Sequence, residues 1–206
     1  MVALLLAASC HRPQPETPPA AEPSRPLAMF AAQKLVVTPT ERVRPDSLGW
    51  VQQLGGFRVA ALRLDSAIVN VLEERGLASR WILPAALVRS YERNRTYAAD
   101  PYQLVVEQLR MPSFKAAQKY GEPLSTQLRT MVALLEDARH VLIPVELRFE
   151  REGTTAAGRA ILRTAIVDPR YAEARFVADI RGDTSSVPAR AIATVASRLV
   201  DLFVAP

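Results

Sequence analysis

Few side chains in this sequence belong to the types that usually carry catalysis or bind metals. The chain of 206 residues holds two histidines and one cysteine. His140 stands where a helix is expected to pass into a strand, which favours a structural hydrogen bond over general-base catalysis. Ser125 and Ser186 precede expected helices, where serine commonly serves as an N-cap. Neither serine lies in a nucleophile-elbow motif.

Carboxylates offer a second kind of chemistry, because a pair of them can act as general acid and general base. The candidates are Asp168 and Asp179. A proline follows Asp168, which is typical of a tight turn, and Asp179 is expected to face solvent. No group of histidine, cysteine and acidic residues has the spacing of metal ligands, and no glycine-rich stretch resembles a phosphate loop. We therefore expect no enzymatic activity, no cofactor and no metal site.

A group of arginines and tyrosines is the strongest candidate for a binding surface. Both residue types are enriched at the energetic centres of protein interfaces. The group, called here the Arg/Tyr surface, consists of Arg89, Tyr91, Arg93, Arg95 and Tyr97. It fits a contact with a protein partner or with an anionic glycan or lipid. A solvated helix end and loop would have the same composition, and the sequence leaves both interpretations open.

The overall charge does not indicate a nucleic-acid partner. The chain has 26 Lys and Arg residues against 21 Asp and Glu, a net charge of +5. Nucleic-acid-binding proteins gather such charge on one face or one helix. Here the basic residues are spread along the whole chain. The length and the ordinary share of hydrophobic residues, 49%, instead indicate one globular domain with a tail.

The N-terminus has the features of a processed leader. Residues 2–8 form a short apolar run that ends in Ala7-Ala8-Ser9-Cys10, and an apolar run followed by small residues is how signal peptides end. Small residues before a cysteine resemble the lipobox of bacterial lipoproteins. That resemblance implies that residues 1–10 are the remnant of a lipoprotein signal peptide and that Cys10 carries the lipid. The alternative is a free cysteine on a frayed terminus.

A proline-rich stretch follows the cysteine. Residues 11–26 contain six of the 16 prolines and no large apolar side chain, so they favour an extended polyproline conformation over a packed core. At about 3.1 Å per residue such a stretch reaches roughly 50 Å. We therefore expect residues 11–28 to be a tether and residues 29–206 to be a single globular domain.

Apolar periodicity predicts the elements of that domain. A buried run at Leu35-Val36-Val37 indicates a strand, residues 64–75 a helix and residues 81–83 a second strand. Further helices are expected over residues 84–91, 101–110 and 125–138. The strand–helix–strand order at the start predicts a parallel pair with a right-handed crossover.

The C-terminal third has the clearest pattern. Apolar residues alternate over residues 141–150, 159–167 and 173–181, which is typical of strands with one buried face. Short connections predict an antiparallel three-strand meander, with an irregularity at Pro144 because proline lacks a donor. A helix over residues 188–204 ends the chain. The predicted class is α/β (α+β), with one mixed sheet and helices packed on it.

Three stretches carry a resemblance to known proteins: residues 34–39 (KLVVTP), residues 135–144 (LEDARHVLIP) and residues 165–176 (AIVDPRYAEARF). In this order, before a terminal helix, they resemble a group of bacterial envelope domains. The group includes the N-terminal domain of TolB, the lipoprotein activators of penicillin-binding proteins and the curli secretion lipoprotein. The resemblance implies a partner in cell-wall synthesis, Tol-like function or envelope assembly.

These observations together predict an envelope lipoprotein that is anchored in the membrane through Cys10. Its domain would be a non-catalytic protein-interaction module on the periplasmic face, with another envelope protein as partner. His11 after the cysteine, in place of aspartate, favours the outer membrane by the habit of the lipoprotein family. The alternative is a small-molecule-binding protein or an enzyme with its site in residues 84–123, which look like an insertion.

Overall fold

The computed structural model describes residues 25–135 and 138–205. Cys10 and most of the expected tether lie outside these residues. In chain order the elements are α1 (Ala28–Ala31), β1 (Leu35–Val37), α2 (Trp50–Gln53), α3 (Phe57–Glu74), α4 (Pro84–Arg93), α5 (Glu107–Arg110), α6 (Leu124–Ala133), β2 (His140–Arg151), β3 (Gly158–Asp168), β4 (Glu173–Arg181) and α7 (Pro188–Asp201). Among the described helices, none is long and apolar enough to cross a membrane.

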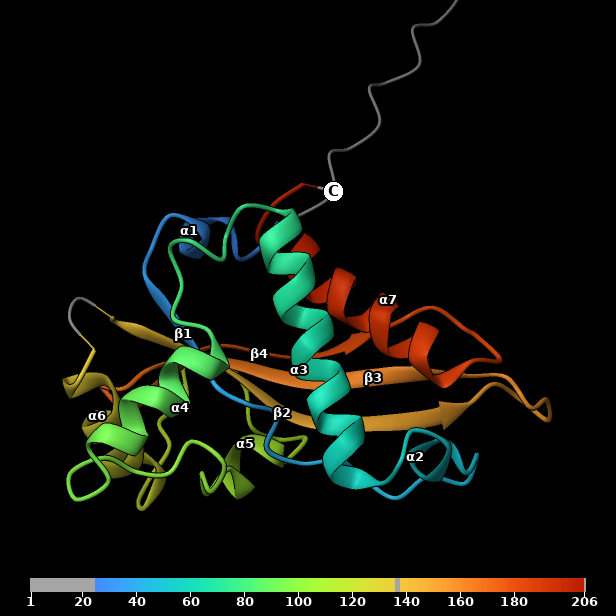
Figure 1. The fold of residues 1–206 in the computed structure, drawn as a ribbon, viewed down its shortest axis with the longest axis horizontal. Helices are drawn as coiled ribbons and strands as arrows, with labels where there is room; N and C mark the ends of the chain where they lie inside the picture. Colours follow the sequence, from blue (N-terminus) through green and yellow to red (C-terminus); the bar gives the residue numbers. More distant parts are fainter. Residues whose placement is uncertain (1–24, 136–137, 206) are drawn as a thin grey trace, which may run out of the picture.

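One mixed sheet forms the centre of the molecule (Figure 1). Its strands lie in the order β1-β2-β3-β4, with β1 parallel to β2 and the other neighbours antiparallel. The pairing of β2 with β3 shifts register between Pro144 and Glu146, as expected for a residue without a backbone donor. The predicted mixed sheet, C-terminal meander and terminal helix are therefore confirmed.

The parallel start of the fold is smaller than predicted. The expected strand at residues 81–83 is reduced to a single parallel bridge between Val36 and Ile82. The backbone of Ile82 accepts a hydrogen bond from Val37 and donates one to Leu35, each 2.8 Å long. Pro84 then begins α4 as its first residue, because its fixed φ suits a helix start. Because α4 begins so soon after Ile82, no second pair of bridged residues forms between this segment and β1.

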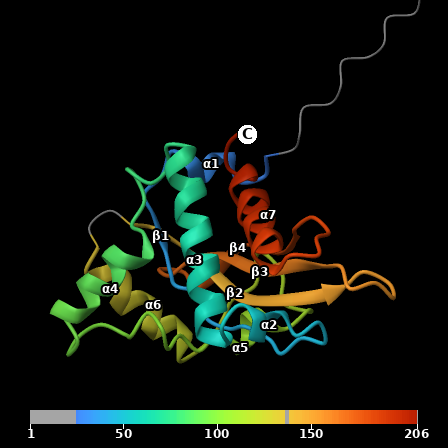
Figure 2. The ribbon, with the colours of Figure 1, turned by 45° about the vertical axis from the view of Figure 1, so that its right-hand side comes forward.

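Helices and irregular segments cover both faces of the sheet. On one face α3 and α7 pack over side chains of alternating strand positions, such as Leu142 and Leu162. The neighbouring positions Val141 and Ile143 point to the other face, where α4, α5 and α6 contribute to a second core. Figures 1 and 2 show α3 and α7 side by side on their face, with α4 and α6 away from them.

The long helix of the first half starts earlier than its sequence suggested. Asp65 looked like an N-cap, but α3 begins at Phe57 and Asp65 lies inside it. Gly56, with a φ of 96°, occupies the cap position instead. The other end agrees with the prediction: Gly76 follows the helix with a φ of 71°, the left-handed conformation that glycine adopts readily.

Two helices of the middle segment are shorter than predicted. Only Glu107–Arg110 is helical within the expected 101–110 stretch. The preceding residues are held by Gln127 of α6, whose amide accepts from the Val105 backbone and donates to the Gln103 carbonyl, both at 2.9 Å. The helix expected over 125–138 is α6, which ends at Ala133. Neither Ser125 nor Ser186 caps a helix, since Pro123 and Val187 occupy those positions.

The folded domain starts slightly before the expected boundary at residue 29. Leu27 is 2% exposed, and its amide donates to the Leu202 carbonyl at 3.1 Å. The start of the described chain and its C-terminal end therefore lie side by side, at the edge where α1 packs (Figure 1).

Candidate functional site

A cavity of about 480 Å³ lies between α3 and the segment that leaves β1. It is called here the Glu41–Asp65 cavity. Its apolar wall includes Val43, Phe57 and Leu62, and Tyr102 of the 84–123 segment also lines it. Phe57 and Leu62 are 46% and 44% exposed, so both side chains present apolar surface to solvent at the cavity. An apolar cleft with a few converging polar groups is the usual form of a ligand site.

Asp65 is fixed in this cavity by the chain that follows β1. Its Oδ1 accepts hydrogen bonds from the Thr40 backbone amide at 2.9 Å and from the Thr40 hydroxyl at 2.6 Å. Burial raises the pKa of Asp65 to about 6, although the two hydrogen bonds act in the opposite direction. At neutral pH the carboxylate is therefore ionised and presents an acceptor.

Glu41 is the more perturbed of the two acids. Burial raises its pKa to about 8, and the nearby Asp65 adds to the shift, while the backbone amide of Leu104 opposes it. Its Oε1 is buried without a hydrogen-bond partner among the described residues. A buried polar atom without a partner is costly. At neutral pH Glu41 mostly keeps its proton, so it offers a donor next to the acceptor of Asp65.

Two buried charges of the sheet hold the 84–123 segment in place. Arg163 of β3, 7% exposed, donates to the backbone carbonyls of Leu109, Met111 and Phe114 at 2.6, 2.6 and 3.0 Å. Its cross-strand partner Glu146 is also 7% exposed.

Glu146 binds Arg110, the last residue of the short helix α5, at the same end where Arg163 binds backbone carbonyls. The Arg110 guanidinium donates to Glu146 through Nε and Nη2, at 2.8 and 2.5 Å. Such paired, charge-assisted hydrogen bonds are strong and fix geometry. The sheet thereby sets the position of α5, and through it the position of the segment that supplies Tyr102 to the cavity.

The Arg/Tyr surface occupies the end of α4 and the turn after it. Arg89, Arg93, Arg95 and Tyr97 are exposed, Tyr97 by 76%, and Tyr91 is half-buried. Within the described ranges these side chains form no ion pair with an acidic residue. These five residues lie on one short stretch of chain, and none of them lines the Glu41–Asp65 cavity. Within residues 84–123, only Tyr102 lines that cavity.

The two candidate carboxylates, Asp168 and Asp179, are not brought together. Asp168 pairs in register with Glu173, whereas Asp179 faces Arg163, five residues earlier on β3. At about 3.3 Å per residue this separates them by roughly 16 Å along the strand. Asp179 instead forms ion pairs with Arg148 at 2.8 Å and Arg163 at 3.2 Å. Asp168 and Asp179 are therefore too far apart to act together on one reacting group.

His140 has a structural environment. The Phe30 ring packs edge-on against its imidazole, with centroids 5.0 Å apart, and its Nε2 lies 3.9 Å from Asp168. Burial lowers the pKa of His140, and the nearby arginines act in the same direction. The expected structural hydrogen bond is not formed through Nδ1, which is buried without a partner among the described atoms. No group of three or more metal-ligating side chains occurs in the part of the chain that the structure describes.

The comparisons with known proteins assign no family to this chain. No protein-family model matches the chain, and a search of curated proteins gives no match. Among solved structures the chain is similar to PelC from Paraburkholderia phytofirmans, solved as a dodecamer. The identity is 15%, the TM-score is 0.38, and the alignment covers 84% of this chain and 89% of that one. A likeness of this size supports no conclusion about function or assembly.

Sequence reasoning missed Glu41 and Asp65 as site residues. Asp65 was assigned to a helix cap, although it follows the buried Leu64 within an apolar stripe. An acid placed between apolar residues of a long helix is the signal that could have found it. Glu41 gave no such signal, because its burial depends on Tyr102 and Leu104, far along the chain.

Proposed function

We propose that this chain is a lipid-anchored protein of the bacterial cell envelope whose folded domain binds a partner and carries out no reaction. The observation that carries the proposal is the order of parts along the chain. Small residues precede Cys10, a proline-rich stretch follows it, and a single packed domain comes next. An acylated cysteine with such a tether holds a domain at a distance from the membrane surface.

Another envelope protein is the proposed partner, bound through the Arg/Tyr surface. The support is that its arginines and Tyr97 are exposed and are not used in ion pairs within the described domain. Arginine and tyrosine contribute most to affinity when a partner removes them from water. The resemblance to envelope domains of the TolB group agrees with this choice. The proposed location is the periplasmic face of the outer membrane.

Site-specific crosslinking in the native host tests this surface. A photoreactive amino acid would replace Tyr97, and in a matched control it would replace Val187, which is 52% exposed at the start of α7. We expect a discrete crosslinked complex from position 97 alone, and its loss when Arg89→Glu and Arg93→Glu are added. The same complex from both positions, or none from position 97, would contradict the proposal.

A second candidate function is the binding of a small molecule in the Glu41–Asp65 cavity. The observation that favours it is a protonated and an ionised acid side by side on an apolar wall. This pair suits a neutral hydroxyl group, which can accept from one acid and donate to the other, on an apolar skeleton. The lining residue Tyr102 comes from the 84–123 segment in which the sequence placed a possible site.

Titration with a cyclic alcohol, followed by amide NMR, tests the second candidate. Cyclohexanol should shift the amide signals of Thr40 and Leu104, and Asp65→Asn should weaken the effect by roughly tenfold, since a charge-assisted hydrogen bond contributes about 1.5–3 kcal/mol. Thr184, remote from the cavity, supplies the control signal. Shifts spread evenly over the domain would exclude a specific site.

A further inference from the structure

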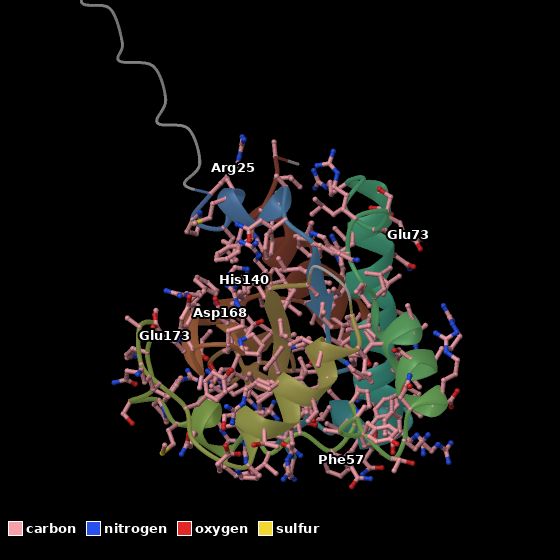
Figure 3. All side chains as sticks on the ribbon, turned by 90° about the vertical axis from the view of Figure 1, so that its left-hand side faces the viewer. Arg25, Phe57, Glu73, His140, Asp168 and Glu173 are labelled. Atoms are coloured by element: carbon pink, nitrogen blue, oxygen red, sulfur yellow. The ribbon has the colours of Figure 1, made fainter. Side chains whose placement is uncertain are left out.

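One edge of the sheet is only partly covered. β4 is the outer strand beside β3, and a short segment of the chain pairs with its first residues. The Ala117 amide donates to the Ala174 carbonyl at 2.7 Å, and the Ala174 amide donates to the Gln118 carbonyl at 2.9 Å. Lys119 forms an antiparallel bridge with Glu173, which Figure 3 shows at the margin of the domain. The edge of β4 therefore already accepts one extended segment.

That segment covers only the start of β4. Ala117 has a φ of 64°, a left-handed conformation that residues other than glycine rarely adopt. Just before it, the Gln118 side chain accepts from the Lys115 amide at 2.9 Å and closes a turn. The chain thus reaches β4 only at Ala117. Beyond that point, over residues 176–181, no other strand lies on the outer side of β4 within the described ranges.

Every second residue of this uncovered part turns its backbone groups away from the sheet. The Gly182 amide donates to the Ala160 carbonyl at 2.9 Å, and the register of β4 with β3 then continues without a shift past Val177. Opposed residues of antiparallel strands alternate between pairs that exchange hydrogen bonds and pairs that do not. Val177, Asp179 and Arg181 belong to the second kind, so their amides and carbonyls face outward. These three residues are called here the open edge.

Apolar side chains flank the open edge on both faces of the sheet. Phe176, Val177 and Ala178 are half-buried. Phe176 packs against the core under α3 and α7, and Val177 packs against the second core on the other face. An added strand would cover the exposed remainder of these side chains while it pairs with the backbone. Extended peptides bind sheet edges in this way, with affinity from the backbone and specificity from alternate side chains.

The charges at the open edge favour a strand of another protein over a second copy of this chain. Asp179 is already paired with Arg148 and Arg163, at 2.8 and 3.2 Å. Arg181 is exposed and forms no ion pair with an acid of the described ranges, so a carboxylate opposite it would add a favourable pair. Two copies paired antiparallel over the open edge would place Asp179 opposite Asp179, and like charges directly opposed are destabilising.

We propose that the open edge binds an extended strand of another protein, with an apolar residue opposite Val177 and an acidic residue opposite Arg181. The bound strand runs antiparallel to β4, the direction that the bridge at Lys119 already has. It lengthens the partial strand that residues 117–120 begin, and its backbone pairs with the outward amides and carbonyls of the open edge. Neither the lipid anchor nor the Arg/Tyr surface is needed for this contact.

A synthetic peptide added to the full chain, with amide NMR as the readout, tests the proposal. The chain carries Cys10→Ala, which keeps lipid out of the sample. The peptide acetyl-Thr-Glu-Thr-Thr-Thr-Val-Thr-amide places its glutamate opposite Arg181 and its valine opposite Val177. In the matched control peptide the same glutamate and valine carry N-methyl groups, which remove both backbone donors and leave the side chains unchanged.

We expect the peptide to shift the amide signals of Val177, Asp179 and Arg181 and to slow their hydrogen exchange. Ala178 and Ile180, whose amides face β3, should exchange slowly with and without the peptide. The N-methylated peptide should bind at least about tenfold more weakly, because it loses hydrogen bonds and adds bulk at the edge. The absence of shifts at the open edge with about 5 mM peptide, or equal shifts with both peptides, would overturn the proposal.

Val177→Pro closes the edge without breaking the sheet. Proline lacks an amide proton, and an edge strand tolerates it where that proton faces solvent. This variant should bind the peptide at least about tenfold more weakly, since it loses a donor and its ring obstructs the added strand. The matched control Val177→Thr keeps the donor and the shape and should stay within about twofold of the wild type. Amide spectra confirm that both variants are folded, and unchanged binding in Val177→Pro would contradict the proposed edge.

A charge exchange at Arg181 tests the register of the bound strand. Arg181→Glu should weaken binding about twofold to fivefold, the range of a cross-strand charge pair, and a peptide with lysine in place of its glutamate should restore the affinity. Arg63→Glu, at an exposed position of α3, is the matched control and should show no such exchange. A loss that the lysine peptide does not restore would overturn the acidic residue opposite Arg181.

Sedimentation of the protein without peptide tests the competing occupant. We expect a monomer at the concentration of the NMR samples, with open-edge amide signals that do not depend on protein concentration. A dimer that dissociates in Val177→Pro would show that a second copy covers the edge, and it would overturn another protein as the occupant.

Discussion

At the scale of single residues, Glu41 shows how position decides the chemistry of a side chain. Its carboxyl is buried, and burial raises its pKa to about 8. Glutamates on the outer surface of α3, such as Glu73, are solvated and have no such environment. The cavity therefore contains a carboxylic acid that donates a hydrogen bond at neutral pH, which a sequence pattern alone does not reveal.

Glu41→Gln should make the stability of the domain less dependent on pH. The folded state keeps the Glu41 proton up to about pH 8, whereas the unfolded state releases it near pH 4.5. Stability therefore falls as the pH rises through this window, by up to about 4 kcal/mol. Glutamine cannot ionise, so the variant should exceed the wild type in stability at pH 9. Urea unfolding from pH 5 to 9 measures this difference.

The matched control for this experiment is Glu73→Gln, on the exposed side of α3. Its stability should follow the wild-type dependence on pH. Asp65 contributes a smaller loss of the same sign, with its pKa raised to about 6, so a residual slope between about pH 4 and 6 is expected in both variants. Parallel curves for the wild type and Glu41→Gln would show that Glu41 is not buried in this way.

At the scale of elements, the regular helices and strands were predictable, but the middle segment was not. The strands β2, β3 and β4 and the helix α7 have local apolar periods that identify them without further information. Residues 94–123 are mostly irregular, and contacts far away in sequence decide their path. Arg163 and Glu146 of the sheet and Gln127 of α6 fix that path. The single bridge at Ile82 depends on the same kind of distant partner, Val36 of β1.

Arg163→Met should release the middle segment while leaving the rest of the fold intact. The substitution removes the donor for the Leu109, Met111 and Phe114 carbonyls and one partner of Asp179. Loss of one member of a buried ionic network costs about 3–5 kcal/mol. Hydrogen exchange should therefore accelerate over residues 104–114 more than over α7. Arg163→Lys, which keeps the charge but not the fork of donors, should retain only part of the protection.

The contact of β4 with α7 offers a test of how closely the last helix packs. A Cβ atom at Gly182 would lie 2.7 Å from the Thr194 hydroxyl and 3.0 Å from the Ala191 carbonyl. Gly182→Ala should therefore push α7 from the sheet and cost about 1–3 kcal/mol in the free energy of unfolding.

Gly121→Ala is the matched control, since a Cβ there would meet only the Gln108 side-chain amide at 3.4 Å. Thermal denaturation of both variants measures their stability. For the control we expect the free energy of unfolding to change by no more than about 0.5 kcal/mol. An equal loss of stability in the two variants would show that α7 is not packed as closely as the structure describes.

At the scale of the whole molecule, the Glu41–Asp65 cavity lies at the end of the domain that holds Phe57, and the described chain starts at the opposite end, near Arg25 (Figure 3). Sequence reasoning found the fold class, because class follows from the order of elements. It did not find the Glu41–Asp65 cavity, because this cavity combines residues from segments that only the folded chain brings together. The expected Arg/Tyr surface was visible in the sequence because it occupies one continuous stretch.

We propose above all that the domain is held at a membrane through Cys10. The most direct test is the intact mass of the protein isolated from the membranes of its own host, beside a Cys10→Ala variant. We expect a chain that begins at Cys10 and carries added fatty-acyl mass, with neither the cleavage nor the added mass in the variant. A wild-type chain that keeps the residues before Cys10 and carries no acyl group would contradict it.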